Sequence, residues 1–355
     1  MLRSGELGRL VEEVGITGLT SNPTIFEKAL AQGEDYQQEM ATALDLRLTP
    51  GQTYERLAVQ DIREAADLLM PVFRSSRGRD GYVSLEVSPL VARDSEATVV
   101  AARRLWARVY RTNLMIKIPA TEEGLEAIPL VMGQGVNVNV TLIFGLERYR
   151  QVLQAHLAGL QAVSRSGGSV TGIAFVASFF VSRVDTAVDR RLEELGQRRP
   201  ELLALRGEAA VANARCARQI WEEWMATPAV KELTAAGAAS PRLLWASTGA
   251  KDPSYRDVRY VEELVEPDTV NTMQLETIRA LLDHGEVRGN TLLNEREHSR
   301  SVLAQLLSAW SDLEKIGAEL EQAGVGLFSE SYRNLVRGLA AQLRGRAGIP
   351  VAIHG

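Results

Sequence analysis

One lysine stands in an apolar segment of the chain. Lys117 is flanked by Leu-Met-Ile and Ile-Pro-Ala in residues 114–120. The segment has no carboxylate to pair with an ammonium ion, and burying an unpaired charge is costly in free energy. Loss of hydration favours the neutral amine, which can attack a carbonyl carbon and form a Schiff base. A lone lysine more often extends to solvent or pairs with a distant acid, but polar residues in other segments favour the nucleophile.

Polar and apolar residues alternate in two further segments. In residues 82–89, Glu86 has the same parity as two serines, and in residues 136–144, Asn139 has the same parity as Thr141. Alternate residues of a strand face opposite sides of a sheet. The residues that we expect to converge on one pocket are Lys117, Glu86, Asn139, Thr141, Ser178 and Ser247.

Short β-rich segments alternate with longer amphipathic ones, which is the order of a parallel sheet with helical crossovers. The predicted strands are residues 16–22, 82–89, 114–120, 136–144, 172–181, 242–248 and 269–273. The predicted helices include residues 53–73, 96–110, 145–165, 183–195, 206–225 and 273–283. An open doubly wound sheet would have strands that are apolar on both faces. The polar faces instead favour a closed (β/α)8 barrel, an α/β fold whose catalytic face lies at the carboxyl ends of the strands.

The composition is that of an ordinary soluble protein. Of 355 residues, 45% are hydrophobic and 24% charged, and the net charge is −5. Scattered basic residues in an acidic chain argue against a nucleic-acid surface. The first residues contain no signal-peptide run, and no segment is apolar enough to cross a membrane, so we expect a cytoplasmic protein. The single cysteine, Cys216, is interpreted as a buried, inert thiol.

The four histidines lie too far apart in sequence to indicate a metal site, and we expect them in loops or on helix surfaces. They are His156, His284, His298 and His354.

Five segments form a recognisable set of motifs: residues 18–26 (GLTSNPTIF), 114–125 (LMIKIPATEEGL), 137–144 (NVNVTLIF), 178–183 (SFFVSR) and 245–249 (WASTG). Together they resemble the transaldolase family, in its longer bacterial type. The resemblance extends from about residue 2 to about residue 343. Five motifs in the same order and spacing are far more specific than any one of them.

The resemblance implies a transferase that uses neither a metal nor an organic cofactor. It would move a dihydroxyacetone unit between sugar phosphates of the pentose phosphate pathway, linking sedoheptulose 7-phosphate and glyceraldehyde 3-phosphate with erythrose 4-phosphate and fructose 6-phosphate. Lys117 would form the Schiff base with the donor ketone. Glu86 and a water held by Thr141 would transfer protons.

The resemblance also implies the substrate-binding residues. Asn22 and Asn139 would bind hydroxyl groups of the donor, and Ser178 would face the same pocket. Arg183 and Ser247 match positions that hold the phosphate, where a guanidinium group suits the oxygens. A second basic phosphate contact of shorter family members falls at Gly249 of this chain, and Lys251 is the candidate replacement.

The chain departs from the family at its start. Family members carry a first barrel strand with a catalytic aspartate, and this sequence begins after that strand. We therefore expect seven of the eight strands, with an N-terminally incomplete barrel over residues 1–344 and a tail or linker over residues 345–355. Either the missing strand lies upstream, or the protein is a seven-stranded barrel with impaired catalysis.

Three alternatives remain open from the sequence. The first is a fructose-6-phosphate aldolase that releases free dihydroxyacetone, although those relatives are shorter and place a tyrosine where this chain has Glu86. The second is a truncated barrel without catalysis that serves as a scaffold. The third concerns assembly, where a homodimer or a fusion to a glucose-6-phosphate isomerase domain is possible. In each case the expected partners are small-molecule sugar phosphates, and neither nucleic acid nor a membrane.

Overall fold

The computed structural model describes residues 2–31, 36–310 and 313–346. The chain divides into two compact units. The first comprises Met1–Lys117 together with Val325–Gly355, and the second comprises Ile118–Gly324. Strand β3 and the last helix, α14, each run from one unit into the other. The predicted tail at 345–355 is described only at its first two residues, which belong to α14, and the rest lies outside the described residues.

The first unit contains three parallel strands with helices between them. Its elements are α1 (Glu6–Arg9), β1 (Gly18–Thr20), α2 (Pro23–Ala31), α3 (Gln37–Asp45), α4 (Pro50–Ser75), β2 (Tyr82–Glu86), α5 (Ser95–Val109), most of β3 (Leu114–Pro119) and the second part of α14 (Leu313–Arg346). A π-helical turn, Leu10–Val14, follows α1, and a 3-10 turn, Pro89–Val91, follows β2. Strand β2 pairs in parallel with β1 on one side and with β3 on the other.

Local sequence explains where the long helix α4 begins. The Thr49 side chain accepts a hydrogen bond from the Gln52 backbone, the Gln52 side chain accepts one from the Thr49 backbone, and Pro50 is the first helical residue. This reciprocal capping satisfies amide groups that a helix start leaves without partners. The helix then buries an apolar face that includes Leu57, Ile62 and Leu69. Burial of this face holds α4 against β2.

The second unit continues the same alternation. Its elements are α6 (Glu122–Met132), β4 (Val138–Ile143), α7 (Leu146–Arg165), β5 (Phe175–Phe180), α8 (Ser182–Gly196), the 3-10 turn Pro200–Leu205, α9 (Ala209–Met225), α10 (Pro228–Ala235), β6 (Arg242–Ala246), α11 (Arg259–Glu262), β7 (Val270–Asn271), α12 (Leu275–His284), α13 (Arg296–Trp310) and the first part of α14. Strands β4 to β7 pair in parallel in chain order. The end of β3 also contributes here, because Ala120 donates its backbone N–H to the Thr141 carbonyl over 2.8 Å.

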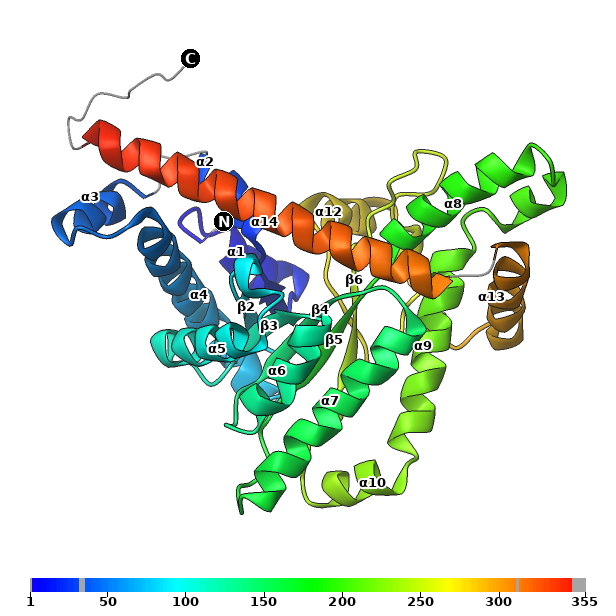
Figure 1. The fold of residues 1–355 in the computed structure, drawn as a ribbon, viewed down its shortest axis with the longest axis horizontal. Coiled ribbons are helices and arrows are strands. Elements are labelled where there is room, and N and C mark those ends of the chain that lie inside the picture. The colour runs from blue at the N-terminus through cyan, green and yellow to red at the C-terminus, as the bar shows by residue number, and fades with distance from the viewer. Residues whose placement is uncertain (1, 32–35, 311–312, 347–355) are drawn as a thin grey trace. The chain divides into compact units, whose positions relative to one another are not determined.

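The first part of helix α14 (Figure 1, orange) packs closely on the end of β4 and on the residues that follow this strand. A Cβ atom on Gly324 would lie 2.8 Å from the Leu142 side chain, and one on Gly317 would lie 3.2 Å from the Gly145 backbone. A side chain at either position would require the neighbouring atoms to shift. The Glu314 carboxylate accepts hydrogen bonds from the backbone N–H groups of Leu146 and Glu147. It therefore caps α7, whose N-cap residue is glycine and has no side chain to do so.

The predicted fold class is confirmed. The strand order in the sheet is β1-β2-β3-β4-β5-β6-β7, and parallel strands with helical crossovers form an α/β fold of the TIM-barrel type. All seven predicted strands are present in the described part of the chain. Every strand is shorter than predicted, and β2, β3 and β6 begin at the predicted residue. The strands end early because β pairing stops where the chain turns towards the next helix.

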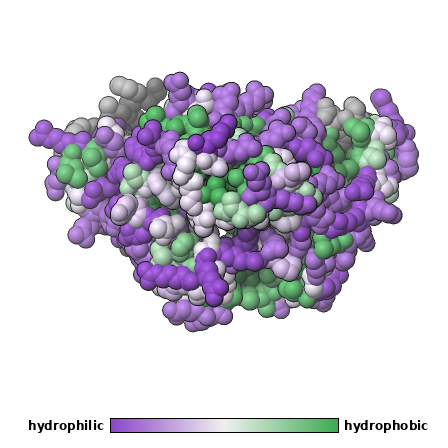
Figure 2. All heavy atoms as spheres, turned by 90° about the horizontal axis from the view of Figure 1, so that it is seen from below, coloured by the Kyte–Doolittle hydropathy of each residue, from purple (hydrophilic) through white to green (hydrophobic). Residues whose placement is uncertain are grey.

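On the face drawn in Figure 2, hydrophilic residues (purple) predominate and hydrophobic ones (green) form separate smaller areas. No described helix combines the length and the hydropathy needed to cross a membrane.

Candidate functional site

The two candidate catalytic residues of the first unit lie side by side. Glu86 and Lys117 are paired residues of the parallel strands β2 and β3. Lys117 Nζ lies 3.3 Å from Glu86 Oε2, and both side chains are almost fully buried, with 6% and 4% exposed. Glu86 is the last residue of β2, so the pair lies towards the carboxyl ends of the two strands. Residues 114–120 alone suggest an uncompensated ammonium ion, and the neighbouring strand corrects that view by supplying the carboxylate.

Burial and charge act on Glu86 in opposite directions. Desolvation raises the pKa of Glu86 above its ordinary value, and the adjacent Lys117 opposes this rise. The buried carboxylate can therefore take up a proton more readily than a carboxylate in water. A buried carboxyl next to an amine suits proton transfer during Schiff-base formation.

The segment after β1 completes the surroundings of the lysine. Lys117 Nζ donates a hydrogen bond to the Ser21 backbone carbonyl over 3.3 Å. The next residue, Asn22, is half-buried, and its Oδ1 accepts a hydrogen bond from the Ile25 backbone at the start of α2. Asn22 therefore has a fixed orientation within the first unit, one residue away from a direct contact of Lys117.

An aromatic residue that the sequence did not indicate also faces the lysine. The centroid of the Phe328 ring, on α14, lies 5.9 Å from Lys117 Nζ. Phe328 is only 4% exposed. In the sequence it is one apolar residue of an amphipathic helix, so its type carried no signal of a role at a site.

In the second unit, two predicted residues are bonded to each other. Ser178 Oγ donates a hydrogen bond to Asn139 Oδ1 over 2.7 Å, across the neighbouring strands β4 and β5. Both residues are buried, with 2% and 0% exposed. The bond fixes the orientation of the Asn139 amide. Because its oxygen accepts from the serine, its NH2 group can donate to other groups.

The backbone is irregular directly after Thr141. The pairing of β4 with β5 shifts register between Val140 and Ile143, and Leu142 has a φ of 61°. A left-handed conformation is uncommon for a bulky residue, and such irregularities occur often beside active sites. The Thr141 hydroxyl is buried and has no hydrogen-bond partner among the protein groups that the structure describes. This hydroxyl is therefore suited to hold a water molecule or a substrate group.

The predicted phosphate-binding residues lie at the carboxyl ends of β5 and β6. The Ser182 and Ser247 hydroxyl groups are 3.0 Å apart, and the Ser182 N–H donates to the Ser247 carbonyl over 3.0 Å. Arg183 is in the first turn of α8, next to Ser182. Burial lowers the pKa of Arg183, which is still a cation at neutral pH, and its guanidinium lies over the Phe180 ring at 5.8 Å. A helix N-terminus with a cation and two hydroxyl groups is a favourable place for an anion.

The remaining candidate is less enclosed. Lys251 is exposed in the segment after β6, four residues beyond Ser247. Gly249 lies between them and packs near Thr277, 3.1 Å from where its Cβ would be. The structure thus places Lys251 on the same connecting segment as Ser247, without a contact between the two side chains.

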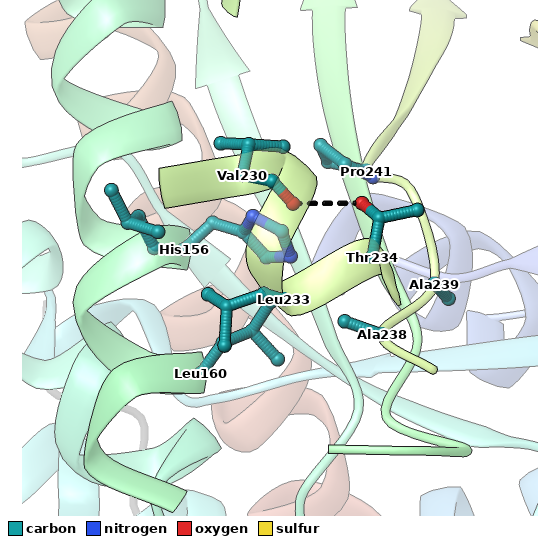
Figure 3. A pocket seen from close by; sticks show the side chains of 9 residues that line it. His156, Leu160, Val230, Leu233, Thr234, Ala238, Ala239 and Pro241 are labelled. Carbon is teal, nitrogen blue, oxygen red and sulfur yellow. Dashed lines mark hydrogen bonds between the residues drawn. The ribbon is translucent and has the colours of Figure 1, made fainter. Parts of the chain in front are cut away.

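His156 differs from the surface histidine that we expected. It is 2% exposed on α7 and packs against Phe175, with ring centroids 4.5 Å apart. It lines a small, mostly apolar cavity with Leu160, Val230 and Pro241 (Figure 3). Phe175 begins β5 and Pro241 precedes β6, so this cavity lies at the amino ends of these strands, opposite to Ser178 and Ser247. Desolvation lowers the pKa of His156 to about 3.

Other sequence predictions for single residues have mixed outcomes. His284 and His298 are exposed as predicted, and His354 lies outside the described residues. Cys216 is buried as predicted, and burial raises the pKa of its thiol. Within the described ranges, His, Cys, Asp and Glu side chains form no group of three or more that could hold a metal ion.

Comparison with known proteins identifies the family. The profile described as Transaldolase/Fructose-6-phosphate aldolase matches residues 2–339. A protein of Saccharopolyspora erythraea named Transaldolase is 47% identical over 344 residues, which cover 96% of this chain and 92% of that protein. Transaldolase 2 of Streptomyces avermitilis is 45% identical, covering 97% and 92%, and Transaldolase of Thermobifida fusca is 46% identical, covering 96% and 92%. The chain belongs to the transaldolase/fructose-6-phosphate aldolase family.

Proposed function

We propose that the protein is a transaldolase that transfers a dihydroxyacetone unit between sugar phosphates through a Schiff base on Lys117. The exchange converts sedoheptulose 7-phosphate and glyceraldehyde 3-phosphate into erythrose 4-phosphate and fructose 6-phosphate, as in the pentose phosphate pathway. The observation that carries this proposal is the buried pair of Lys117 and Glu86, 3.3 Å apart at the carboxyl ends of two barrel strands. A buried lysine with a carboxyl partner has both the nucleophile and the proton carrier that carbinolamine formation requires.

The reaction begins with attack of Lys117 Nζ on the donor ketone. The carbonyl carbon gains the C–N bond, and its oxygen leaves as water after protonation. Glu86 supplies that proton, because desolvation raises its pKa. The iminium ion that forms then accepts the electron pair of the neighbouring carbon–carbon bond. That bond breaks as the hydroxyl on the departing carbon gives its proton to the Glu86 carboxylate, and the first aldehyde is released. The enamine attacks the second aldehyde, and addition of water releases the new ketose and the free amine.

We assign the substrate contacts by the chemistry of each side chain. Thr141 holds a water for proton transfer through its buried hydroxyl. Asn22 and Asn139 bind donor hydroxyl groups through their NH2 groups, since Asn22 Oδ1 accepts from Ile25 and Asn139 Oδ1 accepts from Ser178. Ser178 acts by orienting Asn139.

The phosphate group fits the start of α8. Arg183 and Ser247 bind it, together with the helix N-terminus, and Lys251 approaches from the segment after β6 as an additional cation. The guanidinium of Arg183 has no ion-pair partner among the described residues, which suits a residue that binds an anionic ligand.

We further propose that residues 1–344 act as one catalytic domain in the cytoplasm. The family model matches residues 2–339, which is nearly the whole of this range. A tail or linker from residue 345, a homodimer and a fusion to an isomerase domain are compatible with this assignment.

Borohydride trapping tests the proposal directly. The protein is incubated with fructose 6-phosphate, reduced with borohydride, digested and analysed by mass spectrometry. We expect the reduced three-carbon adduct on Lys117 and none on Lys231, an exposed lysine of α10. An unmodified Lys117 under these conditions contradicts the assignment.

An acceptor-dependence assay separates the proposal from its alternatives. With fructose 6-phosphate as donor, a transaldolase forms glyceraldehyde 3-phosphate rapidly only when erythrose 4-phosphate is present. A fructose-6-phosphate aldolase forms it without that acceptor and releases free dihydroxyacetone. A barrel that serves as a scaffold gives neither product.

A further inference from the structure

Phe328 is held near Lys117 because neighbouring residues of α14 contact other segments of the first unit. One turn further along α14, Ser331 Oγ lies 2.9 Å from Thr24 Oγ1, just after β1. The Tyr332 ring packs edge-on against Tyr54 of α4 at 5.4 Å between centroids. Residues three and four positions apart share one face of a helix. The same face of α14 therefore contacts the segment after β1, the start of α4 and Lys117.

The anchoring continues into an aromatic cluster of the first unit. Tyr54 also packs edge-on against Phe26, with centroids 5.6 Å apart. Phe328, Ser331 and Leu335 are all buried, with 4%, 5% and 4% exposed. The Phe328 ring is thus fixed by packing, and its distance of 5.9 Å from Lys117 Nζ does not depend on a mobile side chain.

The chemistry of a phenyl ring at this position has two consequences. Its face is negative, so it stabilises a cation at a nearby nitrogen, and the iminium on Lys117 is such a cation. The ring also has no hydrogen-bond donor or acceptor, so it cannot hold a water molecule at the reacting centre. A dry, apolar wall limits hydrolysis of reactive intermediates.

We propose that Phe328 determines whether the dihydroxyacetone unit on Lys117 is transferred or released. This inference rests on the Schiff-base function proposed above. The enamine has two routes. In transfer, its carbon forms a bond to the acceptor aldehyde, and hydrolysis then frees the new ketose. In release, the same carbon takes a proton, water adds to the resulting iminium, and free dihydroxyacetone and the lysine amine are formed.

Phe328 favours transfer because it excludes water from the side of the nitrogen that it covers. A smaller residue would admit water there and would speed protonation and hydrolysis of the intermediate. The donor would still be cleaved, since Lys117 and Glu86 are unchanged. The predicted signature is therefore a change of product ratio and not a simple loss of rate.

The experiment measures free dihydroxyacetone and transferred product in the same reaction, with fructose 6-phosphate and erythrose 4-phosphate, for the full chain and its variants. For Phe328→Ala we expect the ratio of release to transfer to rise about tenfold. Leu335→Ala is the matched control: it opens a cavity on the same helix face without exposing Lys117, so it should lower the melting temperature and leave the ratio unchanged. Phe328→Leu keeps most of the volume and should raise the ratio about threefold, so the test stands even where the alanine variant does not fold.

The outcomes separate this inference from the proposed function. Absence of a borohydride adduct on Lys117 of the unaltered protein overturns the Schiff-base function. A trapped adduct together with a ratio in the Phe328 variants within twofold of the unaltered protein overturns the role of Phe328 alone. An equal rise in the Leu335→Ala control does the same, because it would assign the effect to loosening of α14.

Discussion

Two buried nitrogen bases, Lys117 and His156, have opposite surroundings. Lys117 has a carboxylate at 3.3 Å and a backbone carbonyl at 3.3 Å. His156 is buried to a similar degree, but neither ring nitrogen has a hydrogen-bond partner among the described protein groups. Lys117 lies towards the carboxyl end of its strand, whereas the cavity of His156 lies at the amino ends of β5 and β6 (Figure 3).

The difference shows that burial of a titratable group is not by itself the mark of a site. Desolvation alone drives His156 to its neutral form. No group of the described protein forms a hydrogen bond with its ring nitrogens, so it has no partner for proton exchange. Desolvation also acts on Glu86, but that carboxyl has the Lys117 amine 3.3 Å away. A buried base becomes chemically useful when a second titratable group is in contact with it at the catalytic end of the barrel.

Removing the nucleophile should give the largest effect. Lys117→Met keeps an unbranched side chain but cannot form a Schiff base, so we expect transfer activity to fall by more than about 10⁴-fold. The coupled transfer assay measures this loss. Lys231→Met, on the surface of α10, is the control and should retain full activity. Transfer activity of Lys117→Met within tenfold of that of the unaltered protein would show that Lys117 is not the nucleophile.

Removing the partner of the lysine should give the next largest effect. Glu86→Gln preserves shape but cannot exchange a proton, and loss of a general acid–base group costs about 10²–10⁴-fold in rate. The adduct on Lys117 should still form with borohydride, only more slowly. Glu262→Gln alters another buried carboxylate, paired with Arg256 at 3.0 Å, and should reduce stability without this loss of rate. Equal activity losses in the two variants would mean that any buried carboxylate matters as much as Glu86.

The positions of several candidate residues could be predicted because they depend on local sequence. Alternation along the strands gave the parity of Glu86 and Asn139, and the register of β2 with β3 then makes Glu86 and Lys117 neighbours. His156 was predicted wrongly although a signal existed. It is three residues from Leu153 and four from Leu160, on the apolar face of α7, and that spacing indicates burial.

Other features could not be found from local patterns. Phe328 is an ordinary core residue in sequence, and only the path of α14 brings it to Lys117. The left-handed conformation of Leu142 has no sequence signature either, since leucine rarely adopts it and tertiary packing imposes it. Such features depend on contacts between segments that are distant in the chain.

The hydrogen-bonded pair of Ser178 and Asn139 in the second unit should have a smaller effect on the rate. Ser178→Ala removes the hydrogen bond that orients Asn139, and a bond of this kind is worth about 1 kcal/mol, or roughly fivefold to tenfold in rate. We expect the loss chiefly in kcat/KM for the donor sugar, with normal trapping at Lys117. Ser178→Thr retains the hydroxyl and should recover much of the activity. Equal kcat/KM in the alanine variant and the unaltered protein would remove Ser178 from the site.

The smallest effect concerns His156 and is one of stability rather than activity. Because the folded-state pKa of His156 is lowered to about 3, the unfolded chain binds a proton below about pH 6.5 that the folded chain does not. This difference lowers the free energy of unfolding by about 1 kcal/mol for each pH unit between about pH 6 and pH 4, and it disappears above pH 7.

His156→Leu removes this penalty and fills the cavity with an apolar side chain. The stability gain of the variant over the unaltered protein should therefore grow as the pH falls from 7 to 4, as measured by chemical denaturation, while transfer activity at pH 7 stays the same. His284 provides the contrast, because its exposed ring is bonded to Asp257 and Asp283, which raise its pKa. Stabilisation by His284 is present at low pH and is lost as the pH rises, so His284→Gln should change the pH dependence with the opposite sign. A gain for His156→Leu that is constant with pH would mean that the folded protein protonates this imidazole readily, and the contrast with Lys117 would then lie only in position along the strands.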